Sequence, residues 1–352
     1  MELKKLITLT IIFSNLTCLV CSQDIHFSQF GQTPLIINPA LTGTFHGDRR
    51  ALLNYKDQWR SIDAIPYQTM AFSYDWTMMK KKWENSYLGG GIAFFRDKAG
   101  DLSMGQTQIN LSISSIISLN EYQHISAGLQ GGIAQRSIDF SNANWESQFD
   151  GSGINTSLPS NESYTADPFL YPDFSMGVAW HYGTDESNIV ANDMFRANGG
   201  ISYLHLNKPK EVFYDSGEQL HSRMALHCST FFGLRNSVGA LLPSAILYIQ
   251  GPQIESEYGL LFRYMLKEES RYTGIFKESA LSLGGYFRTG DSVIPAALLE
   301  LGNFAFGITY DINISNLKAA TTARGGIELS LRYLSPNPFR TGKGTKSNVR
   351  FM

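Results

Sequence analysis

The sequence is poor in cysteine, and it has no long apolar run beyond its first residues. Of its 3 cysteines, Cys18 and Cys21 lie in an N-terminal stretch that we expect to be removed. The mature chain then keeps only Cys228, which excludes an intrachain disulfide and a thiolate metal cluster. No later apolar run approaches the roughly 18 residues that a transmembrane helix requires. If the protein lies in a membrane, the sequence therefore predicts that it crosses as a β-barrel.

The chain also lacks an excess of charge of either sign. It has 29 basic and 31 acidic residues, which gives a formal net charge of -2. This balance argues against nucleic acid or a polybasic membrane contact as a partner. No Pro-rich linker, charge block or change of composition marks the start of a second domain. We therefore expect one folded unit with no nucleic-acid partner.

The first residues have the pattern of a secretory signal peptide. Lys4 and Lys5 form a basic start, the apolar run LITLTIIF follows, and a small residue, Ser22, precedes Gln23. We expect cleavage near Ser22 and Gln23 and export of the rest of the chain. Lipidation of one of the two N-terminal cysteines is the rival interpretation, but neither of them follows the Gly, Ala or Ser that such sites favour.

Alternation of apolar and polar residues is the main pattern after this leader. In 304–311, Phe304, Phe306, Ile308 and Tyr310 fall on one face of a strand, and small or polar residues fall on the other. The pattern predicts strands over 50–59, 67–76, 87–96, 106–119, 124–136, 174–182, 195–206, 223–235, 243–250, 255–266, 280–288, 293–301, 304–312 and 326–334. This set of about fourteen strands is even in number, as in bacterial outer-membrane barrels.

Alternation alone would also suit a soluble β-sandwich. The two folds differ in whether the sheet closes on itself. A long antiparallel chain must either close on itself or protect two long edges. The longest connection, 137–173, falls on the outer side by parity, and short ones such as 120–122 and 302–303 fall on the periplasmic side. We therefore predict an all-β transmembrane antiparallel β-barrel of about 14 strands with an N-terminal plug-like segment. The predicted division is signal peptide 1–22, plug or periplasmic segment 23–46, outer-membrane barrel 47–334 and tail 335–352.

The stretch FSQFGQTPLIINPALTGTF, residues 27–45, obeys neither a helical nor a strand period. Pro34 and Pro39 push the residues before them toward extended conformations, and the Asn38-Pro39 pair favours a turn. We expect the two prolines to fix extended geometry. The apolar residues that need burial here are Phe27, Phe30, Leu35, Ile36 and Ile37. We predict that 27–44 packs inside or beneath the barrel as a plug.

No local motif points to catalysis. The 7 histidines form no HExxH pair, and no G-x-S-x-G elbow is present. The GGG at 89–91 lacks the strand, turn and helix of a phosphate loop. We therefore expect no catalytic residue, no cofactor and no metal site. Because a charge on the lipid face costs about 2 to 4 kcal/mol at the midplane, charged strand residues are expected in the lumen. They include Arg136, Arg263, Arg288, Glu328 and Arg332.

Several short motifs, taken in order, span almost all of the mature chain. They are F-S-Q at 27–29, N-P-A-L-T-G at 38–43, Y-K-D-Q-W at 55–59, P-D-F-S-M-G at 172–177, F-G-I-T-Y-D at 306–311 and G-G-I-E-L-S-L at 325–331. Together they resemble the PorP/SprF family of Bacteroidetes outer-membrane proteins. The positions that match its motifs are Phe27, Ser28, Gln29, Asn38, Pro39, Ala40, Gly43, Tyr55, Gln58, Trp59, Asp173, Tyr310, Asp311 and Glu328. Two features depart from the family pattern: Gly326 and Ile327 replace a polar-His step, and a tail follows the last strand.

The resemblance implies a barrel that works with the type IX secretion system and the gliding machinery. One type of family member is needed for secretion or cell-surface anchoring of a partner protein such as a large adhesin, recognised through its C-terminal domain. The other type is a core component coupled to periplasmic ring lipoproteins. Either type implies a Gram-negative outer membrane, with outer-membrane lipid around the barrel.

Segment 137–173 is the candidate partner-contact loop, because aromatic and small polar residues together are typical of protein-contact surfaces. The candidate contact residues are Trp145, Phe149, Tyr164, Phe169 and Tyr171. An ordinary solvated loop folded over the barrel mouth is the alternative. We favour a non-enzymatic barrel that binds a secreted partner, with a plugged transport barrel for a small apolar solute as the rival hypothesis.

Overall fold

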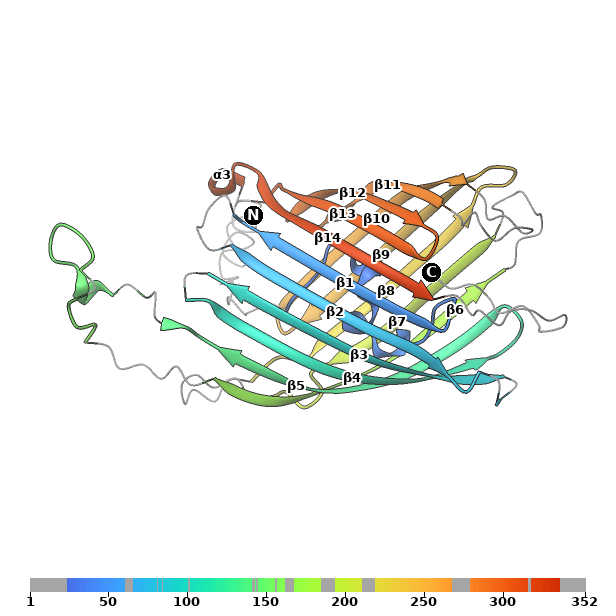
Figure 1. Cartoon of the computed structure of the whole chain (residues 1–352), viewed down its shortest axis with the longest axis horizontal. Helices are drawn as coiled ribbons and strands as arrows, with labels where there is room; N and C mark the ends of the chain where they lie inside the picture. Colours follow the sequence, from blue (N-terminus) through green and yellow to red (C-terminus); the bar gives the residue numbers. More distant parts are fainter. Residues whose placement is uncertain are drawn as a thin grey trace, which may run out of the picture.

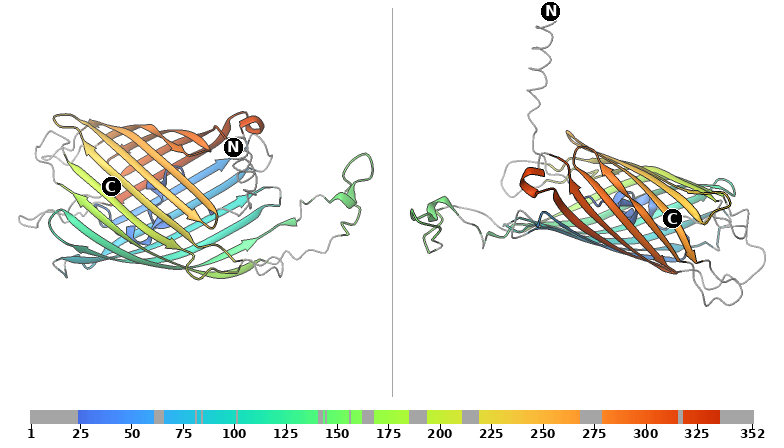
Figure 2. Two further views of the ribbon diagram at one scale, coloured as in Figure 1. Left: turned by 180° about the vertical axis from the view of Figure 1, so that it is seen from behind. Right: turned by 90° about the horizontal axis from the view of Figure 1, so that it is seen from above.

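The protein is a closed barrel of 14 antiparallel strands around a short N-terminal segment (Figure 1). The computed structural model describes residues 24–60, 66–80, 82–83, 85–100, 102–140, 143, 145–155, 157–161, 168–184, 194–210, 219–267, 279–315 and 318–335. Each strand pairs with its neighbours in the chain, and β1 closes the barrel against β14. The strands are strongly tilted in all views (Figure 2). The predicted antiparallel barrel is confirmed.

The strands follow one another in simple up-and-down order. Their bounds are β1 Arg49–Gln58, β2 Tyr67–Met78, β3 Ser86–Ala99, β4 Met104–Ser118, β5 Gln123–Ser137, β6 Phe169–Gly183, β7 Phe195–Leu204, β8 Arg223–Gly233, β9 Gly239–Gln250, β10 Gln253–Lys267, β11 Ser279–Arg288, β12 Ser292–Leu301, β13 Phe304–Asn313 and β14 Arg324–Ser335.

Every predicted strand is present, but some strands begin earlier than expected. The predicted strand 243–250 starts at Pro243, a residue that cannot donate a ladder hydrogen bond. The structure instead extends β9 back to Gly239 and tolerates Pro243 within it. Pairing with β8 stops at Ser244 and resumes at Leu241, so the ladder on that side skips the proline. The cost of the missing N–H is thus confined to one local gap.

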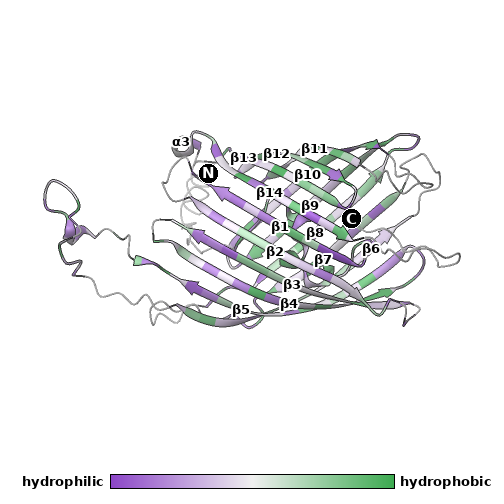
Figure 3. Cartoon of the chain, in the orientation of Figure 1, coloured by the Kyte–Doolittle hydropathy of each residue, from purple (hydrophilic) through white to green (hydrophobic). Residues whose placement is uncertain are grey.

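Side chains alternate between an apolar outer face and a polar lumen. In β13, Phe306 and Ile308 are each 47% exposed, whereas Thr309 and Asp311 are buried. The alternation is visible as bands of opposite hydropathy along the strands (Figure 3). This arrangement presents apolar side chains to lipid and confines charges to the interior.

The chain also contains a few short helices among its described residues. Among the described residues, no helix is long and apolar enough to span a membrane. Besides the turns of the N-terminal segment, η4 covers Glu146–Gln148 and α3 covers Lys318–Thr321.

The two ends of the barrel differ in their connections. We call the end where β1 begins and β14 ends the chain-terminal end, and the opposite end the loop end. The connections between β5 and β6, β7 and β8, and β13 and β14 all lie at the loop end and are long. The turn between β12 and β13, Gly302 and Asn303, is one of the short connections at the chain-terminal end.

The N-terminal segment forms three short helical turns inside the barrel (Figure 1). They are η1 Phe30–Gln32, α2 Pro34–Ile37 and η2 Pro39–Leu41. The expectation of extended geometry at both prolines is wrong, because Pro34 and Pro39 each begin a helical turn. A proline suits this first position, where its missing N–H has no intrahelical partner in any case. The prediction holds only for Asn38, which is extended before Pro39.

Candidate functional site

The N-terminal segment crosses the lumen from the loop end to the chain-terminal end. Asp24 contacts His205 and Gln250, which lie where β7 and β9 end. The chain then passes through the helical turns and enters β1 at Arg49. We call residues 24–48 the plug, because most of their side chains are buried against the inner wall. Within the plug, the turn η2 lies against β4 to β7.

A buried histidine between two carboxylates holds the start of the plug. His205 Nε2 lies 2.6 Å from Asp24 Oδ2, and His205 Nδ1 lies 2.9 Å from Asp173 Oδ1. Burial alone would lower the pKa of His205, but the charges of both carboxylates and the hydrogen bonds with them raise it to about 10. Burial would likewise raise the pKa of Asp24, but the charge of His205 brings it below the ordinary value. The three side chains therefore form a charged latch between plug and wall.

A second polar network binds the F-S-Q motif. Glu328 on β14 accepts hydrogen bonds from the backbone N–H groups of Ser28 and Gln29, at 2.7 and 2.8 Å. The Ser28 hydroxyl donates to Asp311 at 3.0 Å and accepts from Arg288 at 2.8 Å. Arg288 also pairs with Asp311 at 3.1 Å. Because all five residues are buried, these charges depend on one another for hydrogen bonds that water would otherwise supply.

The N-P-A-L-T-G motif is tied to the wall through its asparagine. Asn38 Nδ2 donates to the carbonyl of Val178 at 3.1 Å and to that of Ile201 at 3.3 Å. Its Oδ1 accepts from the N–H of Ala40 at 2.9 Å, which caps η2. One side chain thus fixes both the turn and its position against β6 and β7.

Two glycines allow the plug to approach the wall. Gly43 has φ +72°, a backbone region that other residues rarely adopt, and its N–H donates to Asp75 at 2.8 Å. Asp75 is held in turn by two hydrogen bonds from Arg50, at 2.9 and 2.8 Å. On β5, a Cβ atom at Gly128 would lie 2.4 Å from the carbonyl group of Pro39. The plug could not occupy this position if residue 128 had a side chain.

The remaining motif positions do not all join the plug. Phe27 packs in the lumen in one cluster with Phe95. Tyr310 points outward and is 41% exposed. Three half-buried positions lie on or just beyond the end of β1, away from the plug network: Tyr55, Gln58 and Trp59.

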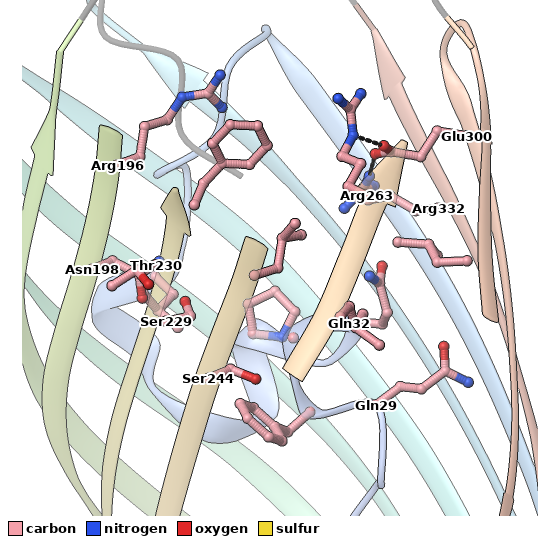
Figure 4. Close-up of a pocket in the computed structure, with 18 of the residues that line it drawn as sticks. Gln29, Gln32, Arg196, Asn198, Ser229, Thr230, Ser244, Arg263, Glu300 and Arg332 are labelled. Atoms are coloured by element: carbon pink, nitrogen blue, oxygen red, sulfur yellow. Dashed lines mark hydrogen bonds and ion pairs between the residues drawn. The ribbon is translucent and has the colours of Figure 1, made fainter. Parts of the chain in front are cut away.

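A cavity of about 470 Å³ lies on the other side of the plug (Figure 4). The plug contributes Phe30 and Ile37 to its lining. From the wall, Arg263 and Arg332 both point toward Glu300 and pair with it, at 2.6 and 2.7 Å (Figure 4). The lumen is therefore filled by the plug on one side and contains a partly charged pocket on the other.

Comparison with known families identifies the family to which this barrel belongs. The profile of a family described as "Type IX secretion system membrane protein PorP/SprF" matches residues 20–333, which include the plug and nearly the whole barrel. The chain belongs to the PorP/SprF family. This PorP/SprF chain is thus a membrane β-barrel of a secretion-system family rather than of an enzyme family, which accords with an outer-membrane location.

Solved barrels resemble this PorP/SprF chain only loosely. The toluene transporter TbuX of Ralstonia pickettii shares 9% identity, with 85% of this chain and 92% of that chain covered and a TM-score of 0.45. The CymD monoaromatic hydrocarbon channel shares 11%, with 90% and 95% covered and a TM-score of 0.46. BamA from Haemophilus ducreyi lacking POTRA domains 1-3 shares 9%, with 82% and 70% covered and a TM-score of 0.42. No curated protein matches the sequence.

The structure changes the bounds of the candidate partner-contact loop. Strand β6 begins at Phe169, so Phe169 and Tyr171 belong to the barrel wall instead of to the loop, and Tyr171 is buried. The predicted strand began only after Pro172, because proline is rare within strands. Trp145 stacks on Phe140 with ring centroids 6.0 Å apart. Tyr164 lies outside the described residues.

The described tip of this loop does not cover the barrel mouth. Phe149 is 57% exposed and pairs with Ile154 in an isolated β-bridge. In both figures this part lies well away from the strands (Figures 1 and 2). Phe149 and Ile154 thus form an exposed apolar pair outside the barrel wall.

Sequence reasoning missed several residues that hold the plug. His205, Asp24, Asp75 and Arg50 are single polar residues without a local motif. The available signal was the period of two along each strand, because Asp75 lies between Tyr74 and Trp76, and Arg50 is two residues before the buried Leu52. Their partners lie at sequence separations that no spacing rule connects. Within the described ranges, no group of three or more His, Cys, Asp or Glu side chains is placed to hold a metal ion.

Proposed function

We propose that this PorP/SprF chain is a non-enzymatic outer-membrane barrel of the type IX secretion and gliding machinery that is needed for secretion or cell-surface anchoring of a partner protein. The partner would be a protein such as a large adhesin, recognised through its C-terminal domain. A signal peptide cleaved near Ser22 and Gln23 would direct the chain to the outer membrane. The observation that carries the proposal is the occupied lumen. A barrel whose interior is bound to its own N-terminal segment offers a surface to partners rather than a passage.

The loop tip supports a partner on the outer side. Phe149 and Ile154 expose 57% and 49% of their surface, and Leu158 nearby exposes 37%. A cluster of exposed apolar side chains on a polar connection is the composition of a contact site. We therefore place the partner-binding residues at this tip and exclude Phe169 and Tyr171, which belong to the wall.

Photo-crosslinking in living cells tests this proposal. A photoreactive amino acid at Phe149 should give an adduct with one secreted protein that carries a type IX C-terminal domain. The matched control is Leu119, which is 55% exposed in the turn between β4 and β5 at the opposite end. An adduct with the secreted protein from position 119, or none from 149, would contradict the proposal.

A second candidate function is that of a core component coupled to periplasmic ring lipoproteins. It is favoured by Met79 and Trp83, which are 45% and 41% exposed in the connection between β2 and β3 at the chain-terminal end. A photoreactive residue at Trp83 should then react with a periplasmic lipoprotein. Adducts from position 83 without any from 149 would favour the core function.

A further inference from the structure

A groove on the lipid-facing side of β3 to β7 is lined by apolar side chains. Its volume of about 750 Å³ lies within the range of about 300–1,000 Å³ that small-molecule sites occupy. The outward-facing residues that line it are Leu88, Ile113, Ser115, Ala127, Leu129, Met176, Val178, Ile201 and Tyr203. Two of these carry a hydroxyl and the others are apolar, so the groove suits an apolar ligand.

Two small side chains form the floor of the groove. Ser115 on β4 pairs with Ala127 on β5, and this pair is flanked on the neighbouring strands by Leu88 and Val178. The next outward row toward the loop end contains large apolar side chains, namely Ile113, Leu129 and Met176. Large side chains on three sides of two small ones leave a depression. A flexible chain in this depression contacts atoms beside it as well as below it.

Aromatic side chains place the groove relative to the membrane. On the outer face near the chain-terminal end, four rings contact one another in a row, with successive centroids 6.0, 5.8 and 6.1 Å apart. They are Trp180, Tyr182, Phe195 and Phe232. Such rings are typical of the membrane–water interface. Val178 lies two residues from Trp180 toward the loop end, about 7 Å along the strand. The groove therefore begins just inside the hydrocarbon core, in the leaflet at the chain-terminal end.

The plug supports the inner side of the same wall. The Ser114 hydroxyl on β4 donates to the carbonyl of Thr42 at 2.5 Å, and the Ser202 hydroxyl on β7 donates to the carbonyl of Ile37 at 2.5 Å. Each of these serines is next in the sequence to residues that line the groove. The turn η2 thus holds the strands from the lumen while their outer face forms the groove, which gives the groove a fixed shape.

We propose that this groove binds one acyl chain of a phospholipid from the periplasmic leaflet and retains it at a defined position. The groove is continuous with the apolar face that the barrel presents to lipid, and in an outer-membrane barrel the chain-terminal end is periplasmic. Within a membrane, packing rather than the hydrophobic effect decides which apolar surface holds a chain. A chain in the groove is contacted on three sides, whereas a chain on the convex face beside it is contacted on one. This inference is independent of the protein partner proposed above, which uses the opposite end of the molecule.

Native mass spectrometry of the purified full chain in detergent tests the inference. The chain should retain one phospholipid after extraction from the membrane. Once this lipid has been removed, added 1-palmitoyl-2-oleoyl-phosphatidylethanolamine should bind saturably, with one molecule per chain. Retention of lipopolysaccharide in place of a phospholipid would contradict the periplasmic leaflet. Lipid-free particles of two chains would show instead that a second copy covers the groove.

Two variants fill the floor of the groove. Ala127→Phe and, separately, Ser115→Leu should each weaken phosphatidylethanolamine binding about tenfold, because the added atoms occupy the place of the acyl chain. Ala245→Phe is the matched control, since Ala245 is a small outward-facing residue of β9 that lies outside the groove. It should bind the lipid as the unmodified chain does.

Each variant is first checked for a folded barrel by its faster migration when unboiled on a gel. The substituted side chains face away from the lumen, so neither the plug nor its hydrogen bonds are altered directly. Unchanged lipid affinity in a folded Ala127→Phe or Ser115→Leu chain would overturn the inference. An equal loss of affinity in Ala245→Phe would overturn it as well.

Discussion

Single buried side chains hold the plug at defined points, and each has partners far away in the sequence. Glu328 binds two consecutive N–H groups of the plug, and Asn38 binds two strands of the wall. Removing one partner from such a group leaves the other buried without a hydrogen bond, which costs more than the bond itself contributes. The plug is therefore sensitive to single substitutions at these points.

Glu328→Gln tests the first of these points. The amide keeps one acceptor oxygen but turns its NH₂ group toward an N–H donor, so one charged hydrogen bond is lost. We expect plug docking to weaken by about 1.5 to 3 kcal/mol. Faster proteolysis within 27–44 in intact barrels measures the loss. Glu121→Gln, at an exposed turn position, is the control, and equal cleavage of the two variants would contradict the assigned role.

The latch at the start of the plug depends on pH. The pKa of His205 is raised from 6.5 to about 10, so its stabilisation is complete below pH 6.5 and is lost as the pH rises through about 10. The pKa of Asp24 is lowered from 3.8, so its stabilisation is complete above pH 3.8 and is lost as the pH falls through the lowered value. The latch is therefore strongest between pH 3.8 and 6.5.

A spin label at Ile25, in a Cys228→Ser background, reports this dependence. Its mobility should increase as the pH rises through about 10, the folded pKa of His205. In His205→Gln, the label should be mobile already at neutral pH. An alkaline transition that survives in His205→Gln would assign the change to another group.

At the scale of elements, the plug and the wall fit together through positions that have no side chain. Gly128→Ala would place a Cβ atom 2.4 Å from the Pro39 carbonyl, so either η2 or β5 must move. We expect a loss of about 1 to 3 kcal/mol in stability, as for other overpacked sites. Gly31→Ala is the matched control within the plug, because its Cβ would meet no atom within 4 Å. Thermal unfolding of both variants checks this, and equal midpoints would refute the close fit.

The elements also show what the sequence allows one to predict. All the strands followed from alternation, because each strand has one face in lipid and one in a polar lumen. The helical turns of the plug did not follow, because they are too short for a helical period and are held in place by bonds to the wall such as that of Asn38. The start of β6 was also missed, since Pro172 interrupts the local pattern.

At the scale of the whole molecule, the plug fills part of the lumen and is bound to the wall on several sides. The hydrogen bonds of Ser28 and Gln29 with Glu328 join the first motif of the chain to β14, which carries the last motif. The sequence indicated that these residues matter and that 27–44 needs burial. Which residues meet could not be predicted, because contacts between distant segments depend on barrel closure rather than on spacing.

Closure of the lumen predicts the electrical behaviour of the barrel. Purified chain in planar bilayers should show no steady conductance, because buried ion pairs and apolar plug residues occupy the lumen. Combining Glu328→Gln with Gly128→Ala should produce intermittent openings as the plug loosens. Large steady channels in the unmodified chain would refute a firmly held plug.

The most direct test of the account is the surface proteome of a strain that lacks this chain. We expect loss from the cell surface, or release into the medium, of one large protein with a type IX C-terminal domain. Expression of the unmodified chain should restore it, whereas a chain with Phe149→Ser and Ile154→Ser should fold but fail to do so. An unchanged surface proteome in the deletion strain would contradict the central claim that this plugged barrel acts on a secreted partner.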